Sequence, residues 1–409
     1  MSSSADVPSD ADLRSLPTRV KKQYEKALAA GDAFFYPSEK IAILHDDLPS
    51  GPDGTGKGSG VEWQVRIVPA LLKKPKANGD QPQGEKDSTK DEKDQGAEGK
   101  EAKPQQNKQD VFAPPYVPNL LVQEFGEHVV LLNKFCVVPQ HFLMVTRDFE
   151  TQNLPPSPAT LALAYRIVTA HRSSETELLG FYNCGQLSGA SQPHRHLQFV
   201  QAPPLDLNND EGDNADIEAI LESDHKVPVE ALLDRIERDG KELDHVHALP
   251  LPWQHFVALL QPEKEVRSDP AKLERYIGNK FMGLLDALFR ARTFAASAAS
   301  EGGAATAPSD DELKAMRGPP SFNILLTKRA MHVIPRSRED FEDLPRDSEG
   351  KVGNLSINSL GYAGFMLTRS KEEQDALSRL DGGVPKVLAK TGVAPVADVT
   401  VSDGLPTSS

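Results

Sequence analysis

The sequence lacks the cysteines, the long apolar runs and the basic excess that mark several large protein classes. Cys136 and Cys184 are its only cysteines in 409 residues, so a disulfide framework is excluded and a reducing compartment is indicated. No apolar run approaches the length of about 18 residues that a membrane helix requires. The N-terminus has no apolar signal core either, so we expect no secretion and no membrane span. We expect a cytoplasmic protein, with the nucleus as a second location.

Acidic residues outnumber basic ones by 60 to 46, which gives a net charge of −14. Proteins that bind nucleic acid without sequence preference are usually basic, so we expect no nucleic-acid partner. An acidic protein can still bind a small polyanion if lysine, arginine and backbone N–H groups are concentrated at the site.

The patterned segments favour an α+β fold with an antiparallel sheet, because strands follow one another along the chain and helices are few. Apolar spacing predicts helices over residues 13–31, 157–172 and 270–292, the second with Ser157 as its N-cap. Alternating or continuous apolar runs predict strands within 61–72, 128–146, 178–185, 194–202, 252–260 and 321–340.

Polar and low-complexity segments divide the chain into two domains. Residues 1–220 form an N-terminal domain that we expect to be catalytic, interrupted by an insertion at 76–110 whose composition predicts disorder. Residues 245–392 form a C-terminal domain with a low-complexity spacer at 295–312. Residues 393–409 are expected to be a loose tail.

The stretch GASQPHRHLQ, residues 189–198, places two histidines and a glutamine at alternate positions. On a strand, His194, His196 and Gln198 share one face. The intervening side chains face the other, buried side, to which we assign Leu197, Phe199 and Val200. The small residues before the histidines can form a nest of backbone N–H groups that binds an anion. A histidine row beside such a nest suggests chemistry at phosphorus.

The residue types in this row favour nucleotidyl transfer. A neutral imidazole is a nucleophile near physiological pH, and its attack on an α-phosphate gives a covalent nucleotidyl-histidine. Gln198 can donate a hydrogen bond to a phosphoryl oxygen, but it cannot act as a proton acid. A third histidine at that position would favour hydrolysis, whereas glutamine favours transfer to another anionic acceptor.

Two other interpretations of the histidine row stay open at this point. A His-x-His pair is a fair start for a zinc or iron site, although no Cys-x-x-Cys is present and the nearest downstream carboxylates lie far along the chain. The pair can also be structural, on a solvent-facing or buried strand. A second pair, His245 and His247, lacks a Gly/Ser loop, and we interpret it as structural.

The segment NCGQLSGASQPHRHLQ, together with LLNKFCVVPQHFLMVT and the later FNILLT and MHVIPR, resembles the fungal-type ATP adenylyltransferases, also called diadenosine tetraphosphate phosphorylases. That family belongs to the histidine triad superfamily and is similar to the galactose-1-phosphate uridylyltransferases. The resemblance implies a histidine-triad-like antiparallel sheet with flanking helices. A short similarity between residues 136–150 and 330–342 adds the hypothesis of two related halves.

The resemblance also implies an activity. Diadenosine tetraphosphate and phosphate would be converted reversibly to ATP and ADP through an adenylyl-histidine. No cofactor would be required, although Mg²⁺ could act through the substrate phosphates, and no metal site on the protein is expected. A histidine-triad dinucleoside polyphosphate hydrolase and a non-catalytic nucleotide-binding module remain the alternatives.

The family's functional residues can be carried over by position. His196 would be the nucleophile, His194 its supporting partner, and Gln198 would hold the α-phosphate oxygens. The resemblance implies further substrate-binding roles for Lys74, Asn133, Lys134, Asn183, Gly189, Ala190, Ser191, Gln192, Asn323, Thr327 and Lys328.

Overall fold

The computed structural model describes residues 8–48, 58–73, 110–173, 176–204, 215–238, 245–300, 319–345, 354–395 and 401–402. A ten-stranded sheet forms the centre of the molecule, in the order β17-β10-β11-β13-β12-β8-β9-β7-β5-β4. Every neighbouring pair in it is antiparallel. The α+β class and the antiparallel sheet are therefore confirmed.

The strands of this sheet come from both halves of the chain. They are β4 (Leu121–Phe125), β5 (His128–Leu132), β7 (Phe142–Thr146), β8 (Glu177–Cys184), β9 (His196–Ala202), β10 (His245–Ala248), β11 (Phe256–Leu259), β12 (Phe322–Leu326), β13 (Ala330–Pro335) and β17 (Val401–Ser402). The halves meet where β8 pairs with β12, with Asn183 directly opposite Asn323.

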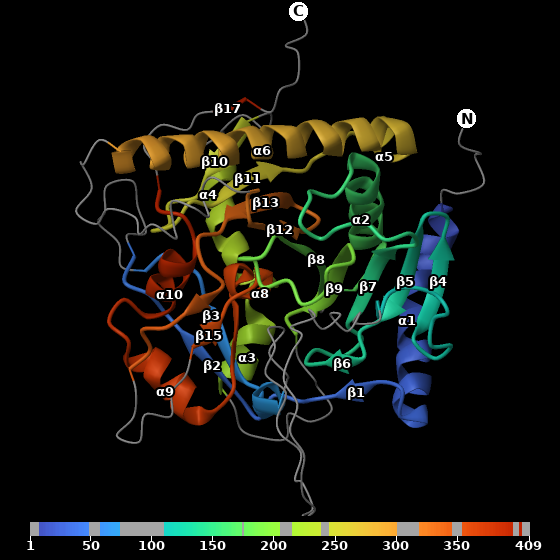
Figure 1. The fold of residues 1–409 in the computed structure, drawn as a ribbon, viewed down its shortest axis with the longest axis horizontal. Coiled ribbons are helices and arrows are strands. Elements are labelled where there is room, and N and C mark those ends of the chain that lie inside the picture. Colours follow the sequence, from blue (N-terminus) through green and yellow to red (C-terminus); the bar gives the residue numbers. More distant parts are fainter. Residues whose placement is uncertain are drawn as a thin grey trace, which may run out of the picture.

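Three helices cover one face of the sheet. They are α1 (Asp10–Ala30), α2 (Pro158–Ala170) and α6 (Pro270–Ser300). In Figure 1, α6 runs along the top of the view above β10, β11 and β13, while α1 stands at the right beside β4 and β5. The apolar sides of α1, α2 and α6 share one hydrophobic core with inward-facing strand residues such as Leu197 and Phe199.

A second hydrophobic core lies on the opposite face of the sheet, under elements from both ends of the chain. A three-stranded sheet joins β2 (Lys40–Leu44), β3 (Trp63–Ile67) and β16 (Phe365–Thr368), and here the parallel β3–β16 pair again links the two ends of the chain. The remaining elements are β1 (Phe34–Phe35), β6 (Phe135–Cys136), β14 (Asp340–Phe341), β15 (Leu355–Ser356), α3 (Ala215–Glu222), α4 (Leu233–Arg238), α5 (Lys264–Arg267), α8 (Ser359–Ala363), α9 (Lys371–Arg379), α10 (Gly383–Thr391) and the 3₁₀ helices η1 (Pro69–Lys73) and η2 (Pro228–Leu232).

The predicted helices form, with shifted ends. The Ser157 side chain accepts from the backbone N–H of Thr160 and caps α2 as expected. Gly31 ends α1 in the left-handed conformation. The expected spacer at 295–312 begins inside α6, because its alanine-rich first residues continue the helix to Ser300. The rest of that spacer lies outside the described residues, and so does the predicted insertion at 76–110 except for its last residue, Asp110.

Two expectations need correction. The chain after residue 392 is not entirely loose, because the Val393 N–H donates to the Pro335 carbonyl and β17 pairs with β10. Val200 does not share the side of Leu197 and Phe199. Strand alternation places it in the second core, on the face of His196 and Gln198.

Candidate active site

His196 is the first residue of β9, and its side chain is 2 % exposed. Its Nδ1–H donates to the backbone carbonyl of His194 at 2.8 Å. This bond assigns the ring proton to Nδ1 and leaves Nε2 with a lone pair that no described residue engages. Burial lowers the pKa of His196 to about 4. The imidazole is therefore neutral and nucleophilic near physiological pH.

His194 has partners at both ring nitrogens. Nδ1 donates to the carboxylate of Asp110 at 2.7 Å, and Nε2 lies 2.8 Å from the carbonyl oxygen and 3.1 Å from the hydroxyl oxygen of Thr146. The ring is 1 % exposed and thus committed to contacts within the protein. His194 contacts His196 through its backbone carbonyl, and its catalytic role stays a prediction.

A buried glutamine fixes the backbone of His196. The Gln152 side-chain oxygen accepts from the His196 N–H at 2.8 Å, and its amide nitrogen donates to the carbonyls of His196, at 3.3 Å, and Asn183, at 2.8 Å. The sequence gives no sign of this role, because Gln152 lies in a connection between β7 and α2, 44 residues from His196.

The loop between β8 and β9 presents free backbone donors. Gly185 and Gly189 have φ values of 83° and 81°, which favour glycine. The buried Ser188 hydroxyl donates to the Gly185 carbonyl at 2.6 Å and tightens the turn. Among the described residues, no hydrogen-bond partner is found for the N–H groups of residues 189–192. Four consecutive amides without a partner suit the binding of phosphate oxygens, which stays a prediction for Gly189, Ala190, Ser191 and Gln192.

The side chains of Asn183 and Asn323 support this loop through buried hydrogen bonds. The Asn323 amide nitrogen donates to the Asn183 side-chain oxygen at 2.8 Å and to the Ser188 carbonyl at 3.0 Å. Its own side-chain oxygen accepts from the buried Arg336 at 2.7 Å. Asn323 is 0 % exposed, and its amide supports the loop. The Asn183 oxygen also accepts from Ser359, which leaves the Asn183 amide nitrogen as its remaining donor.

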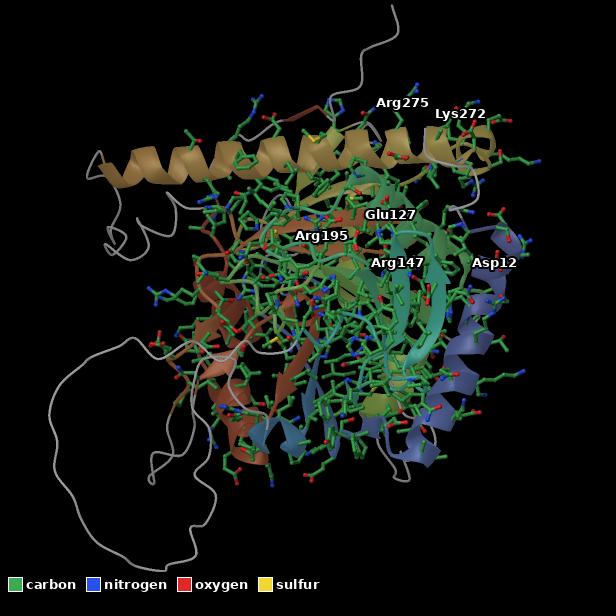
Figure 2. The ribbon with its side chains drawn as sticks, turned by 45° about the vertical axis from the view of Figure 1, so that its right-hand side comes forward. Asp12, Glu127, Arg147, Arg195, Lys272 and Arg275 are labelled. Carbon is green, nitrogen blue, oxygen red and sulfur yellow. The ribbon has the colours of Figure 1, made fainter. Side chains whose placement is uncertain are left out.

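Gln198 lies on the same face of β9 as His196, opposite Leu143 on β7. Its side chain is half-buried, and no described residue hydrogen-bonds to it. Arg195 faces the other way, as expected, and forms an ion pair with Glu150. Figure 2 shows Arg195 near the centre of the molecule, while Glu127 and Arg147 lie toward the β4–β5 hairpin. On the face that His196 and Gln198 share, His196 Nε2 and the Gln198 side-chain amide have no hydrogen-bond partner among the described residues.

Among the described residues, none of the remaining expected substrate-binding residues hydrogen-bonds to His196. Asn133 donates from its amide to His141 Nδ1 at 2.9 Å, and the Lys134 ammonium lies 5.6 Å from the centre of the Phe135 ring. Thr327 follows β12 at the end away from Asn323, and its hydroxyl donates to the buried Glu230. Lys328 directly follows Thr327 in the chain. Lys74 falls outside the described residues.

The described part of the chain contains no group of three or more His, Cys, Asp or Glu residues that could hold a metal ion. Within the same ranges, no helix is both long and apolar enough to cross a membrane. The two thiols are free and buried, and burial raises the pKa of each to about 12, so neither serves as a nucleophile near neutral pH.

Two protein-family profiles match the sequence. The Ap4A phosphorylase N-terminal domain matches residues 86–223, and the ATP adenylyltransferase C-terminal domain matches residues 249–394. Diadenosine 5',5'''-P1,P4-tetraphosphate phosphorylase 2 of Saccharomyces cerevisiae is 30% identical over 300 residues, which cover 69% of this chain and 76% of the yeast protein. Protein APA1 of the same yeast is 29% identical over 369 residues and 88% of each chain.

Solved structures share the fold. The crystal structure of yeast Ap4A phosphorylase Apa2 in complex with AMP aligns with a TM-score of 0.59 at 23% identity, over 96% of this chain and 99% of that one. The same yeast protein in complex with Ap4A aligns with a TM-score of 0.59 at 24% identity, over 93% and 98% of the two chains.

Proposed function

The chain belongs to the Ap4A phosphorylase family, and from that premise we propose that it catalyses the reversible phosphorolysis of diadenosine tetraphosphate to ATP and ADP. The observation that carries the proposal is the state of His196. Its Nδ1–H is bound to the His194 carbonyl, its ring is neutral, and its Nε2 has no partner among the described residues. It stands beside a loop of four free backbone N–H groups.

The reaction proceeds in two displacements at the same phosphorus. The lone pair on His196 Nε2 attacks the α-phosphorus of diadenosine tetraphosphate, a bond from nitrogen to phosphorus forms, and the bond to the departing ATP breaks. An oxygen of inorganic phosphate then attacks the adenylyl group, the nitrogen–phosphorus bond breaks, and ADP leaves. Phosphate is already anionic near neutral pH, so the second step needs no general base.

The neighbouring groups stabilise the charge that develops on the α-phosphate. The N–H groups of residues 189–192 and the amide of Gln198 can donate to its oxygens without reorganising, which is the main requirement for electrostatic stabilisation. The Asn183 amide nitrogen is a further donor at the base of the loop. Mg²⁺ would act, where it is needed, through the polyphosphate of the substrate.

Isotope exchange tests the two-step route. An adenylyl-enzyme that reacts with phosphate must exchange labelled phosphate into ADP in the absence of any second nucleotide, and the exchange should disappear in His196→Ala. A nucleotide-binding module would show no exchange. A hydrolase would consume diadenosine tetraphosphate without phosphate and release AMP.

We also infer that the ten-stranded sheet consists of two related, histidine-triad-like halves. In chain order the first contains β5, β7, α2, β8 and β9, and the second contains β10, β11, α6, β12 and β13. Outward from the β8–β12 junction the strand orders correspond, β8-β9-β7-β5 against β12-β13-β11-β10. The corresponding helices α2 and α6 contact each other on the same face. The same order of elements on both sides supports the inference.

The domain limits at 1–220 and 245–392 and the cytoplasmic and nuclear location stay predictions. The substrates that we propose are small molecules only: diadenosine tetraphosphate, phosphate, ATP and ADP.

Limited proteolysis between residues 220 and 245, followed by gel filtration, would test whether the two predicted domains separate. We expect them to stay together, because their strands share one sheet.

A further inference from the structure

The segment Asp110–Phe112 lies against both histidines of the site. One carboxylate oxygen of Asp110 accepts from His194 Nδ1 at 2.7 Å, and the other accepts from the Phe112 N–H at 3.0 Å. The Phe112 ring centre is 5.1 Å from that of His196 and 6.2 Å from that of His194. A single carboxylate thus ties the position of the phenyl ring to the histidine row.

The Phe112 ring rests on an apolar surface that continues the nucleophile's face of the sheet. It packs on a cluster of four buried residues from β5 and β7, namely Val129, Leu131, Leu143 and Val145. Val145 lies opposite His196, and Leu143 lies opposite Gln198. One flank of His196 is therefore apolar, while the loop at residues 189–192 supplies polar donors.

We propose that Phe112, held in place by Asp110, shields the adenylyl-His196 intermediate from water and so sets the ratio of phosphorolysis to hydrolysis. This inference rests on the proposed function. The competing reaction is attack of a water oxygen on the adenylyl phosphorus, which breaks the nitrogen–phosphorus bond, yields AMP and releases a proton. An apolar ring beside the imidazole gives water no hydrogen-bond partner there. The N–H groups of residues 189–192 remain available to bind phosphate.

The test measures the ratio of AMP to ADP formed from diadenosine tetraphosphate at saturating phosphate. For Phe112→Ala we expect this ratio to rise about tenfold, because water enters beside the intermediate. The half-life of the isolated adenylyl-enzyme in phosphate-free buffer should shorten by the same factor. Phe112→Leu keeps an apolar side chain and should stay close to the unsubstituted protein. Asp110→Ala releases the ring from its anchor and should shift the ratio in the direction of Phe112→Ala.

Phe149→Ala is the matched control. The Phe149 ring lies 5.4 Å from the ring of His194, is largely exposed, and has no ring contact with His196 among the described residues. Its removal should leave the ratio unchanged. If Phe149→Ala raises the ratio as much as Phe112→Ala, the effect is not specific to the flank of His196 and the proposal is wrong.

Other results would also overturn the inference. An unchanged ratio in Phe112→Ala would do so. A raised KM for diadenosine tetraphosphate with an unchanged ratio would make Phe112 a substrate contact instead of a shield. If Phe112→Ala does not fold, Asp110→Ala takes its place as the test, and an unchanged ratio of AMP to ADP in that variant would contradict the inference. Absence of any adenylyl-enzyme in the unsubstituted protein would refute the proposed function itself, which keeps the two failures distinct.

Discussion

The Nδ1–H of His196 donates to the backbone carbonyl of His194 at 2.8 Å. This one bond decides which ring nitrogen can react, because it fixes the tautomer with the lone pair on Nε2. Both residues belong to the same short stretch, so the geometry is set locally by a strand that begins at His196. Gln152 and Asp110, which are distant in sequence, then hold that stretch in place.

Replacing His196 by alanine should abolish turnover. The variant loses the atom that forms the bond to phosphorus, so we expect kcat to fall at least about a thousandfold. Rapid quenching with α-labelled diadenosine tetraphosphate should show no protein-bound label. His45→Ala removes an exposed imidazole outside the site and should leave kcat unchanged. Retention of phosphorolysis by His196→Ala would disprove the assignment of the nucleophile.

Gly189→Ala should impair catalysis more than stability. At φ 81° an alanine is strained, and its Cβ would lie 2.9 Å from the Asn358 Cβ and 3.0 Å from the Ile357 carbonyl oxygen. The loop must then shift, and a displacement of its N–H groups should lower kcat/KM roughly tenfold to a hundredfold.

Gly31→Ala separates the effect of backbone strain from that of the loop. Gly31 has a similar φ of 73°, but a Cβ there would meet nothing within 4 Å. We expect it to lose about 1 kcal/mol of unfolding free energy, measured in urea, and to keep full kcat/KM. Equal activity losses in Gly31→Ala and Gly189→Ala would show that general destabilisation, and not the loop, is responsible.

Gln198→His should turn part of the phosphorolysis into hydrolysis. An imidazole on the face of His196 can transfer protons to and from water and the leaving group, which an amide cannot do. We expect the rate of AMP formation without phosphate to rise roughly tenfold. Gln201→His places the same ring on the opposite face of β9, because positions 198 and 201 are three residues apart on the strand. It should leave the rate of AMP formation unchanged. If the two variants behave alike, the assigned role of Gln198 is wrong.

Local features of the site could be predicted from the sequence, and long-range ones could not. The shared face of His196 and Gln198 follows from strand alternation, and the free N–H groups follow from the Gly/Ser composition of the loop. Asp110 pairs with a histidine 84 residues away. Asp110 lies at the end of a segment whose composition predicts a polar insertion. No local pattern therefore identifies it as the partner of a histidine in the site.

The same distinction applies to Asn323 and Val200. The bonds of the Asn323 amide to Arg336 and Asn183 join distant parts of the chain, and its predicted contact with substrate stays a prediction. Val200 was assigned to the wrong face because both faces of β9 are covered, so an apolar residue occurs on each. Where a sheet has no solvent-facing side, hydrophobicity alone does not show which way a side chain points.

The buried Glu230 should make stability fall as the pH rises. Burial raises the pKa of Glu230 to about 7, while the Thr327 hydroxyl and Arg329 act in the opposite direction. Unfolding restores an ordinary glutamate pKa of about 4.3. The stabilisation by the protonated carboxyl is therefore fully present below that value, and it is lost as the pH rises through about 7.

Glu230→Gln isolates this contribution, because glutamine does not titrate and its side-chain oxygen still accepts from Thr327. Urea unfolding should give similar free energies for the two proteins at about pH 4, and at pH 8 the variant should be more stable by on the order of 2 kcal/mol. Glu237→Gln removes a partly exposed partner of Arg329 and should change stability by less than about 1 kcal/mol at either pH. A difference between Glu230→Gln and the unsubstituted protein that stays constant from pH 4 to 8 would show that Glu230 does not titrate in this range in the folded state.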